Sequence, residues 1–131
     1  TDLLDLYLQE ILELVEIKNG AKLPIFVLEK DEINIQPDIV KDGIHIIFPN
    51  LVTEPRAQYL MRYMSITNDS ILELFKTINV INGADDIFDI AVIERNNWLM
   101  HGSSKPNHKA YKLTNIYKIK WFKWKKISWW N

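Results

Sequence analysis

The stretch that decides the predicted fold is a short apolar segment between turn residues: Lys41-Asp42-Gly43-Ile44-His45-Ile46-Ile47-Phe48-Pro49. Asp-Gly opens it as a turn, and the proline closes it because proline has no N–H to donate to a strand ladder. The β-branched residues between them predict a central strand. Alternation along a strand places His45 and Ile47 on one face and Ile44, Ile46 and Phe48 on the other. His45 is then either a structural histidine or a functional one.

The segments around this strand predict an α+β fold. Helical periodicity covers 2–17, 53–66 and a segment that begins at 68–70 and ends before Asn82-Gly83, with Thr53 as the expected N-cap of the second helix. Apolar runs predict strands over 23–30, 88–93 and 98–100. The long polar connection 31–42 leaves open whether the strands on either side of it pair as a hairpin or in parallel. This order of elements favours a sheet with helices on one face.

The composition bounds the class of protein. Of the 131 residues, 47% are hydrophobic and 25% are charged, which is ordinary for a soluble globular domain. There is no cysteine, so disulfides and thiolate metal sites are excluded and a reducing compartment is expected. No apolar run approaches the roughly 20 residues of a membrane span, and no signal-peptide pattern opens the chain, so we expect a cytoplasmic location.

Charge is strongly segregated along the chain. Residues 1–104 carry 17 acidic and 8 basic residues, whereas residues 105–131 carry 8 lysines and no acid. A basic segment of this kind is either a solvated tail or the contact surface for a polyanion.

The final segment, 118–131, combines lysines with aromatic residues. Tryptophans among lysines are suited to binding a single-stranded nucleic acid, because bases stack on the rings and phosphates are attracted to the ammonium groups. The candidates are Trp121, Lys123, Trp124, Lys125 and Lys126. A membrane-surface or partner-binding amphipathic helix is the other interpretation, since Trp121, Trp124 and Ser128 fall at helical spacing. Lys125 lies near that same helical face and weakens it.

Several segments together carry a resemblance to a known family. They are the strand 42–49, the pair Phe88-Asp89, the run Asn97-Trp98-Leu99-Met100-His101-Gly102-Ser103-Ser104-Lys105-Pro106, and Tyr111-Lys112-Leu113-Thr114. In this order and spacing they resemble the archaeo-eukaryotic primase domain of the primase-helicases of large DNA viruses, of the poxvirus-like and giant-virus types. The resemblance covers roughly residues 23–117. It implies a partial RRM-like primase sheet and an incomplete primase-polymerase catalytic domain over 1–117, with 118–131 as a basic aromatic tail.

The resemblance also implies the positions of a nucleotidyl-transfer site. In the family, three carboxylates hold two metal ions, Mg²⁺ or Mn²⁺, and a histidine contacts the phosphates of the incoming nucleotide. By position, His45 is this histidine and Asp89 is the third carboxylate, which makes both implied catalytic residues and Asp89 an implied metal ligand. Ser103 and Lys105 are implied nucleotide contacts. The alternatives are a turn-and-cap role for Asp89 and a solvated loop position for Lys105.

The sequence departs from the family pattern where the first motif is expected. No Asp-x-Asp pair on a strand precedes His45, and a single carboxylate cannot hold two ions. We therefore expect a fragment of a viral DNA primase that belongs to DNA replication and is inactive alone. A split or decayed reading frame and a designed function fit this expectation equally well. The alternative is a non-catalytic module that binds single-stranded nucleic acid.

The resemblance implies partners and a location as well. The partners are a nucleoside triphosphate, a single-stranded DNA template, and a helicase domain or the missing N-terminal part. The location is the host cytoplasm or a viral replication site. If His45 and Asp89 face one nucleotide, their strands are close neighbours in the sheet.

Overall fold

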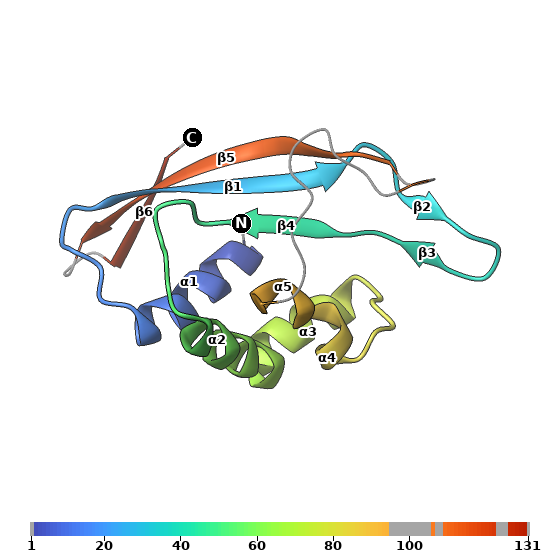
Figure 1. Cartoon of the computed structure of the whole chain (residues 1–131), viewed down its shortest axis with the longest axis horizontal. Helices are drawn as coiled ribbons and strands as arrows, with labels where there is room; N and C mark the ends of the chain where they lie inside the picture. Colours follow the sequence, from blue (N-terminus) through green and yellow to red (C-terminus); the bar gives the residue numbers. More distant parts are fainter. Residues whose placement is uncertain (1, 95–105, 107–108, 123–125, 131) are drawn as a thin grey trace. The chain divides into compact units, whose positions relative to one another are not determined.

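A computed structural model describes residues 2–94, 106, 109–122 and 126–130. The chain divides into two compact units, and each is described by itself: Thr1–Ile17 with Thr53–Asn97, and Lys18–Val52 with Trp98–Asn131. The described elements of the first unit are helices and those of the second are strands (Figure 1). The predicted α+β class is therefore confirmed.

The second unit is built on a four-stranded antiparallel sheet with the strand order β4-β1-β5-β6 (Figure 1). Strand β1 spans Lys22–Lys30, β4 spans Ile44–Ile47, β5 spans Tyr111–Phe122 and β6 spans Lys126–Trp130. The predicted strands 23–30 and 44–48 are confirmed, but the central position predicted for the second is wrong, because β4 is an edge strand of this sheet. Their antiparallel pairing answers the question that the sequence left open, because β1 and β4 form a hairpin with a wide connection.

That connection contains a small sheet of its own. Strands β2 (Asn34–Ile35) and β3 (Val40–Lys41) pair antiparallel within the segment that joins β1 to β4. The polar composition of the connection concealed these two short strands, each of two residues.

Alternation along β1 produces one closely packed face of the sheet. Leu23, Ile25 and Val27 are 6%, 0% and 4% exposed, and Ile119 of β5, which lies opposite Leu23, is 2% exposed. Burying an aliphatic side chain of this size contributes about 1.5–3 kcal/mol to stability. A bulge between Val27 and Leu28 interrupts the pairing of β1 with β5 and places Leu113 opposite Leu28.

The first unit consists of five helices among its described residues. Helix α1 spans Asp2–Leu14, α2 spans Pro55–Thr67, α3 spans Asp69–Thr77, α4 spans Ala84–Ile87 and α5 spans Ala91–Glu94. The first predicted helix is therefore three residues too long, although the amide of Val15 still donates to the carbonyl of Ile11 at 2.9 Å. None of the helices in the described part of the chain has the length and apolar character needed to cross a bilayer.

Asn68 connects three helices, because it follows the last residue of α2, precedes the first residue of α3 and contacts α1. Asn68 caps α3 by accepting a hydrogen bond from the amide of Ile71 at 3.0 Å, and its side-chain amide donates to Glu10 of α1. Ile71 is fully buried. The expected cap of α2 at Thr53 is wrong: the N-cap position is Glu54, whose side chain makes no cap hydrogen bond. Pro55 at the first position needs no amide partner, so part of the usual demand for a cap is absent.

Candidate functional site

His45 lies on β4, the edge strand of the four-stranded sheet, where its register partner is Leu28 of β1. The residue is half-buried, and its Nδ1 atom is buried. The sequence therefore predicted both its strand and its place on a sheet face. It did not predict what holds the imidazole ring.

The imidazole of His45 stacks on the phenol ring of Tyr111. The ring centroids are 3.9 Å apart and the planes differ by 14°. Tyr111 is the first residue of β5 and lies opposite Lys30 of β1, so the two rings approach each other over β1 from the strands on either side of it. Tyr111 is 9% exposed, and Nζ of Lys30 lies 5.0 Å from its ring centroid, at cation–π distance.

Gly43 provides the space that this stack requires. A Cβ atom added at Gly43 would lie 2.6 Å from the phenol oxygen of Tyr111, closer than carbon and oxygen atoms approach without bonding. The predicted turn at Asp42-Gly43 is wrong, because these residues lead directly from β3 into β4. Gly43 is instead needed for the space that the Tyr111 ring occupies. Tyr111 begins one of the segments that resemble the primase family, but the sequence did not mark it as a site residue.

Burial and charge both act on the Tyr111 phenol. Burial raises the pKa of Tyr111, and the nearby carboxylate of Asp42 raises it further. Both effects favour the neutral phenol, so Tyr111 keeps its proton at physiological pH. The stack therefore presents a neutral aromatic ring to the imidazole, with the ammonium group of Lys30 close by.

Asp89 lies in a different environment from the one predicted. The expected strand 88–93 is wrong, because Asp89 connects the short helices α4 and α5, and its carboxylate accepts a hydrogen bond from the amide of Ala91 at 2.9 Å. Asp85 and Asp86 lie in the first turn of α4, where the helix dipole favours acids. Local capping thus outweighs the strand propensity of the isoleucine and valine residues.

Contacts of the neighbouring Phe88 fix this connection within the helical unit. Its ring packs edge-on against Tyr7 of α1 and Phe75 of α3, with centroid distances of 5.7 and 6.0 Å. Arg62 of α2 donates from Nε to the carbonyl of Phe88 at 2.9 Å and from Nη2 to the carbonyl of Asp85 at 3.0 Å. The expectation that His45 and Asp89 lie on neighbouring strands is therefore wrong, because Asp89 is on no strand and belongs to the other unit.

The described residues do not fit a two-metal centre. Within the ranges that the structure describes, no three His, Asp or Glu side chains form a group that could hold a metal ion. One oxygen of Asp89 already accepts the Ala91 amide. A two-metal reaction needs several hard oxygen ligands around ions about 3.5–4 Å apart. No chemical step through metal ions is therefore derived from these residues.

Other predicted site residues fall partly outside the described chain. Ser103 and Lys105, the expected strand 98–100, and Lys123, Trp124 and Lys125 all lie outside the described residues. Trp121 lies near the end of β5 and Lys126 at the start of β6, where each has a partner in the β5–β6 pairing. The amphipathic-helix interpretation of the tail is wrong for its described parts, because they form strands.

Comparisons with known proteins identify the family of this chain. The family model described as the C962R protein N-terminal AEP domain, where AEP stands for archaeo-eukaryotic primase, matches residues 1–117. The chain belongs to this family of primase domains from the primase-helicases of large DNA viruses. It is also 33% identical over 86 residues to a protein of Acanthamoeba polyphaga mimivirus named "Putative helicase L207/L206". That match covers 66% of this chain and 9% of the mimivirus protein.

Proposed function

We propose that this chain is part of the primase-polymerase domain of a viral DNA primase and takes part in DNA replication as a nucleotidyltransferase component. Membership of the primase family supports this proposal. The observation that carries it is the His45–Tyr111 stack, since a half-buried imidazole is held on a sheet face and the Lys30 ammonium lies 5.0 Å from the centroid of the Tyr111 ring. These are donor groups suited to the phosphates of a nucleotide.

In this proposal His45 contacts the triphosphate, and Ser103 and Lys105 are further nucleotide contacts. The family's Mg²⁺ or Mn²⁺ centre is not assigned to the described residues, because they form no group that could hold an ion and the Asp89 carboxylate accepts the Ala91 amide. The chain is accordingly inactive as a polymerase by itself. A helicase domain and a DNA template are its proposed partners, and the host cytoplasm or a viral replication site is its proposed location.

The proposal is tested by measuring nucleoside triphosphate binding first and primer synthesis second, on the same samples. A fluorescent nucleoside triphosphate is titrated into the intact chain and into His45→Ala, with Lys76→Gln on the exposed face of α3 as the control. A charge-assisted hydrogen bond contributes about 1.5–3 kcal/mol, so His45→Ala is expected to weaken binding at least tenfold. Equal affinity of His45→Ala and the intact chain would contradict the proposal.

The same samples are then given a single-stranded template and Mg²⁺ or Mn²⁺. No primer is expected, because one carboxylate cannot replace three. Incorporation of nucleotide that disappears in Asp89→Ala would show that the chain is a complete polymerase and that the proposed inactivity is wrong.

A second candidate function is a non-catalytic module that binds single-stranded nucleic acid. The observation that favours it is the charge segregation, with 8 lysines and no acid in residues 105–131. In this case single-stranded DNA binds independently of nucleotide, and His45→Ala leaves that affinity unchanged. His45→Ala therefore distinguishes the two candidate functions: the primase function predicts weaker nucleotide binding by this variant, and the binding-module function predicts unchanged affinity for single-stranded DNA.

A further inference from the structure

The face of the sheet that carries His45 is basic along its length. Lys22 and Lys30 lie on the same face of β1 because their positions differ by an even number of residues. The register places Lys120 opposite Lys22 and Lys118 opposite Pro24, so both lysines of β5 share this face. We call this surface the basic face and define it by its lysines: Lys22, Lys30, Lys118 and Lys120.

The two faces of the sheet differ in charge and in exposure. On β1, β4 and the part of β5 up to Lys120, Glu29 is the acid among the described strand residues, and it lies on the face opposite Lys22 and Lys30. That opposite face contains the buried Ile25 and Ile119. On the basic face Lys22 and Lys118 are exposed, whereas Leu28, opposite His45, is 4% exposed. The exposed lysines of this face therefore lie toward the start of β1 and the end of β5.

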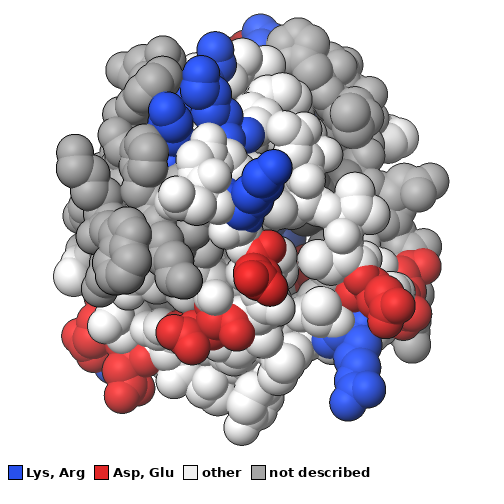
Figure 2. All heavy atoms as spheres, turned by 90° about the vertical axis from the view of Figure 1, so that its left-hand side faces the viewer, with Lys and Arg blue, Asp and Glu red and all other residues white. Residues whose placement is uncertain are grey.

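Apolar side chains lie between the lysines on the basic face. Ile116, which is 46% exposed, lies opposite Phe26 near the middle of the β1–β5 pair. From Lys22 to Lys30 the strand extends for about 26 Å at roughly 3.3 Å per residue. Figure 2 views the end of the sheet at which β1 begins and β5 ends, and there Lys and Arg side chains gather in the upper part of the view.

Charge complementarity identifies the class of partner. No residue of β1, β4 or β5 that lies on this face is acidic among the described residues, so its lysines attract a polyanion, and exposed apolar side chains between them offer contact to unpaired bases. A duplex keeps its bases stacked inside and would leave that apolar strip without a counterpart. A single strand meets both requirements.

The geometry points to the basic face as a binding track for single-stranded nucleic acid. Phosphates lie at Lys22, Lys118 and Lys120, and the strand runs toward the His45–Tyr111 stack. The inference rests on the proposed function for the identity of the strand as a primase template. It goes beyond that function by assigning the path of the single strand to the basic face of the sheet. This path does not depend on the tryptophans of the segment 118–131.

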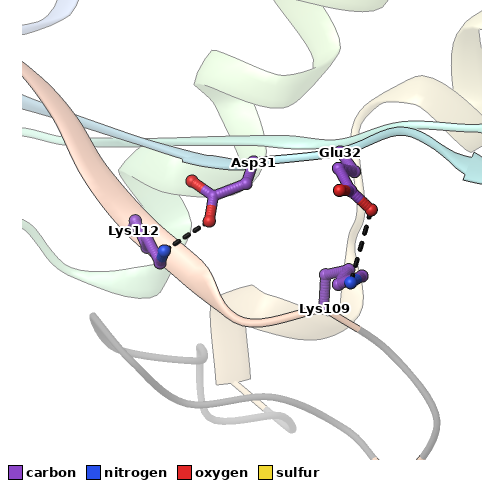
Figure 3. A network of polar contacts seen from close by, with 4 residues as sticks. All are labelled: Asp31, Glu32, Lys109 and Lys112. Carbon is purple, nitrogen blue, oxygen red and sulfur yellow. Dashed lines mark hydrogen bonds and ion pairs between the residues drawn. The ribbon is translucent and has the colours of Figure 1, made fainter.

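Two lysines of the same unit serve as a matched control. Lys109 forms an ion pair with Glu32 at 3.3 Å, and Lys112 forms one with Asp31, as Figure 3 shows. Lys112 lies opposite Glu29, on the other face of the sheet. Their charges are compensated by carboxylates, so removing them changes the net charge as much as removing Lys118 and Lys120 does, without touching the basic face.

The experiment is a fluorescence titration of labelled single-stranded oligothymidylate at several salt concentrations. Lys118→Gln/Lys120→Gln is expected to weaken binding and to lower the slope of log affinity against log salt by about 0.7 per lost phosphate contact, or about 1.4 in all. Lys109→Gln/Lys112→Gln is expected to leave the slope near that of the intact chain. Equal slopes for the two double variants would overturn the inference, and so would equal affinity for a duplex of the same length.

Two further measurements keep this test decisive. Circular dichroism melting shows whether each variant folds, and the single variant Lys118→Gln, at an exposed position, replaces the double variant if that one does not fold. The nucleotide titration with His45→Ala separates the two proposals. Nucleotide binding that is indifferent to His45, together with a Lys118-dependent salt slope, would refute the proposed nucleotide contact of His45 and leave the binding track standing.

Discussion

At the scale of single residues, the environment of His45 is set by a residue far along the chain. The Asp42-Gly43 pair and Pro49 marked the bounds of its strand correctly, because both signals are local, although Asp42-Gly43 forms no turn. Tyr111 could not be predicted as its partner, since that contact depends on β5 pairing with the other side of β1. The signal was a tyrosine at the start of a strand-like run, but an aromatic residue there is usual in any sheet.

The first prediction of this kind concerns the ring stack itself. In Tyr111→Ala the imidazole protons of His45 lose the ring current of the phenol, and their NMR signals are expected to move downfield. Stability is expected to fall by about 3 kcal/mol, the usual cost of truncating a buried aromatic residue. Tyr111→Phe keeps the ring, so both the NMR signals and the urea midpoint are expected to stay close to those of the intact chain. Unchanged imidazole signals in Tyr111→Ala would show that the stack is absent in solution.

The phenol adds a pH dependence to the same variants. Because the folded-state pKa of Tyr111 is raised above the ordinary value of 10.0, the folded chain keeps its proton where the unfolded chain has lost it. The stabilising contribution is therefore complete below about pH 10 and is lost as pH rises through the folded-state pKa. Tyr111→Phe is expected to show a smaller loss of stability above pH 10, measured by urea unfolding, than the intact chain.

At the scale of elements, long amphipathic helices and the buried strand were predictable, and short elements were not. The pattern of 23–30 is continuous and apolar, and it became β1 almost unchanged. The segment 88–93 has similar β-branched residues, yet the contacts of Phe88 with Tyr7 and Phe75 hold it among helices. The packing of the Phe88 ring and the capping hydrogen bond of Asp89 thus together outweigh the strand propensity of this segment.

The role of Asp89 as a cap can be separated from a role as a metal ligand. Asp89→Ala removes the acceptor for the Ala91 amide and is expected to cost about 1 kcal/mol in urea unfolding. Asp89→Asn and Asp89→Ser keep a capping oxygen and are expected to match the intact chain within a few tenths of a kcal/mol. If all three variants were equally stable, the capping hydrogen bond would contribute nothing. If Asp89→Asn is as stable as the intact chain, the same substitution in a longer parent enzyme removes the negative charge of this candidate metal ligand without changing the fold.

At the scale of the whole molecule, the basic C-terminal segment proves to be partly structural. Its charge and its aromatic residues favoured an appended tail beginning at residue 118, but β5 continues through that point to Phe122 and pairs with β1 as far as Lys22. The alternation Lys118-Ile119-Lys120 was the signal for a strand with one buried face. It was masked by the richness of the segment in lysine and tryptophan.

The last prediction follows from this continuity and concerns where the chain can be shortened. A chain that ends at Tyr117 loses Ile119, which is 2% exposed, together with the pairing of residues 118–120 to the start of β1. A chain that ends at Phe122 keeps both. Loss of a buried isoleucine alone costs about 2–5 kcal/mol, so the shorter chain is expected to unfold at clearly lower urea concentration than the longer one.

The same pair of truncations divides binding to single-stranded DNA between the sheet and the tail. The chain ending at Phe122 keeps Lys118 and Lys120 and is expected to retain a salt-dependent affinity, reduced by whatever residues 123–131 contribute. The chain ending at Tyr117 lacks both lysines and is expected to bind more weakly still at every salt concentration. Equal stability and equal affinity of the two truncated chains would mean that β5 ends functionally at Tyr117, and that the lysines beyond it belong to neither the fold nor the binding surface.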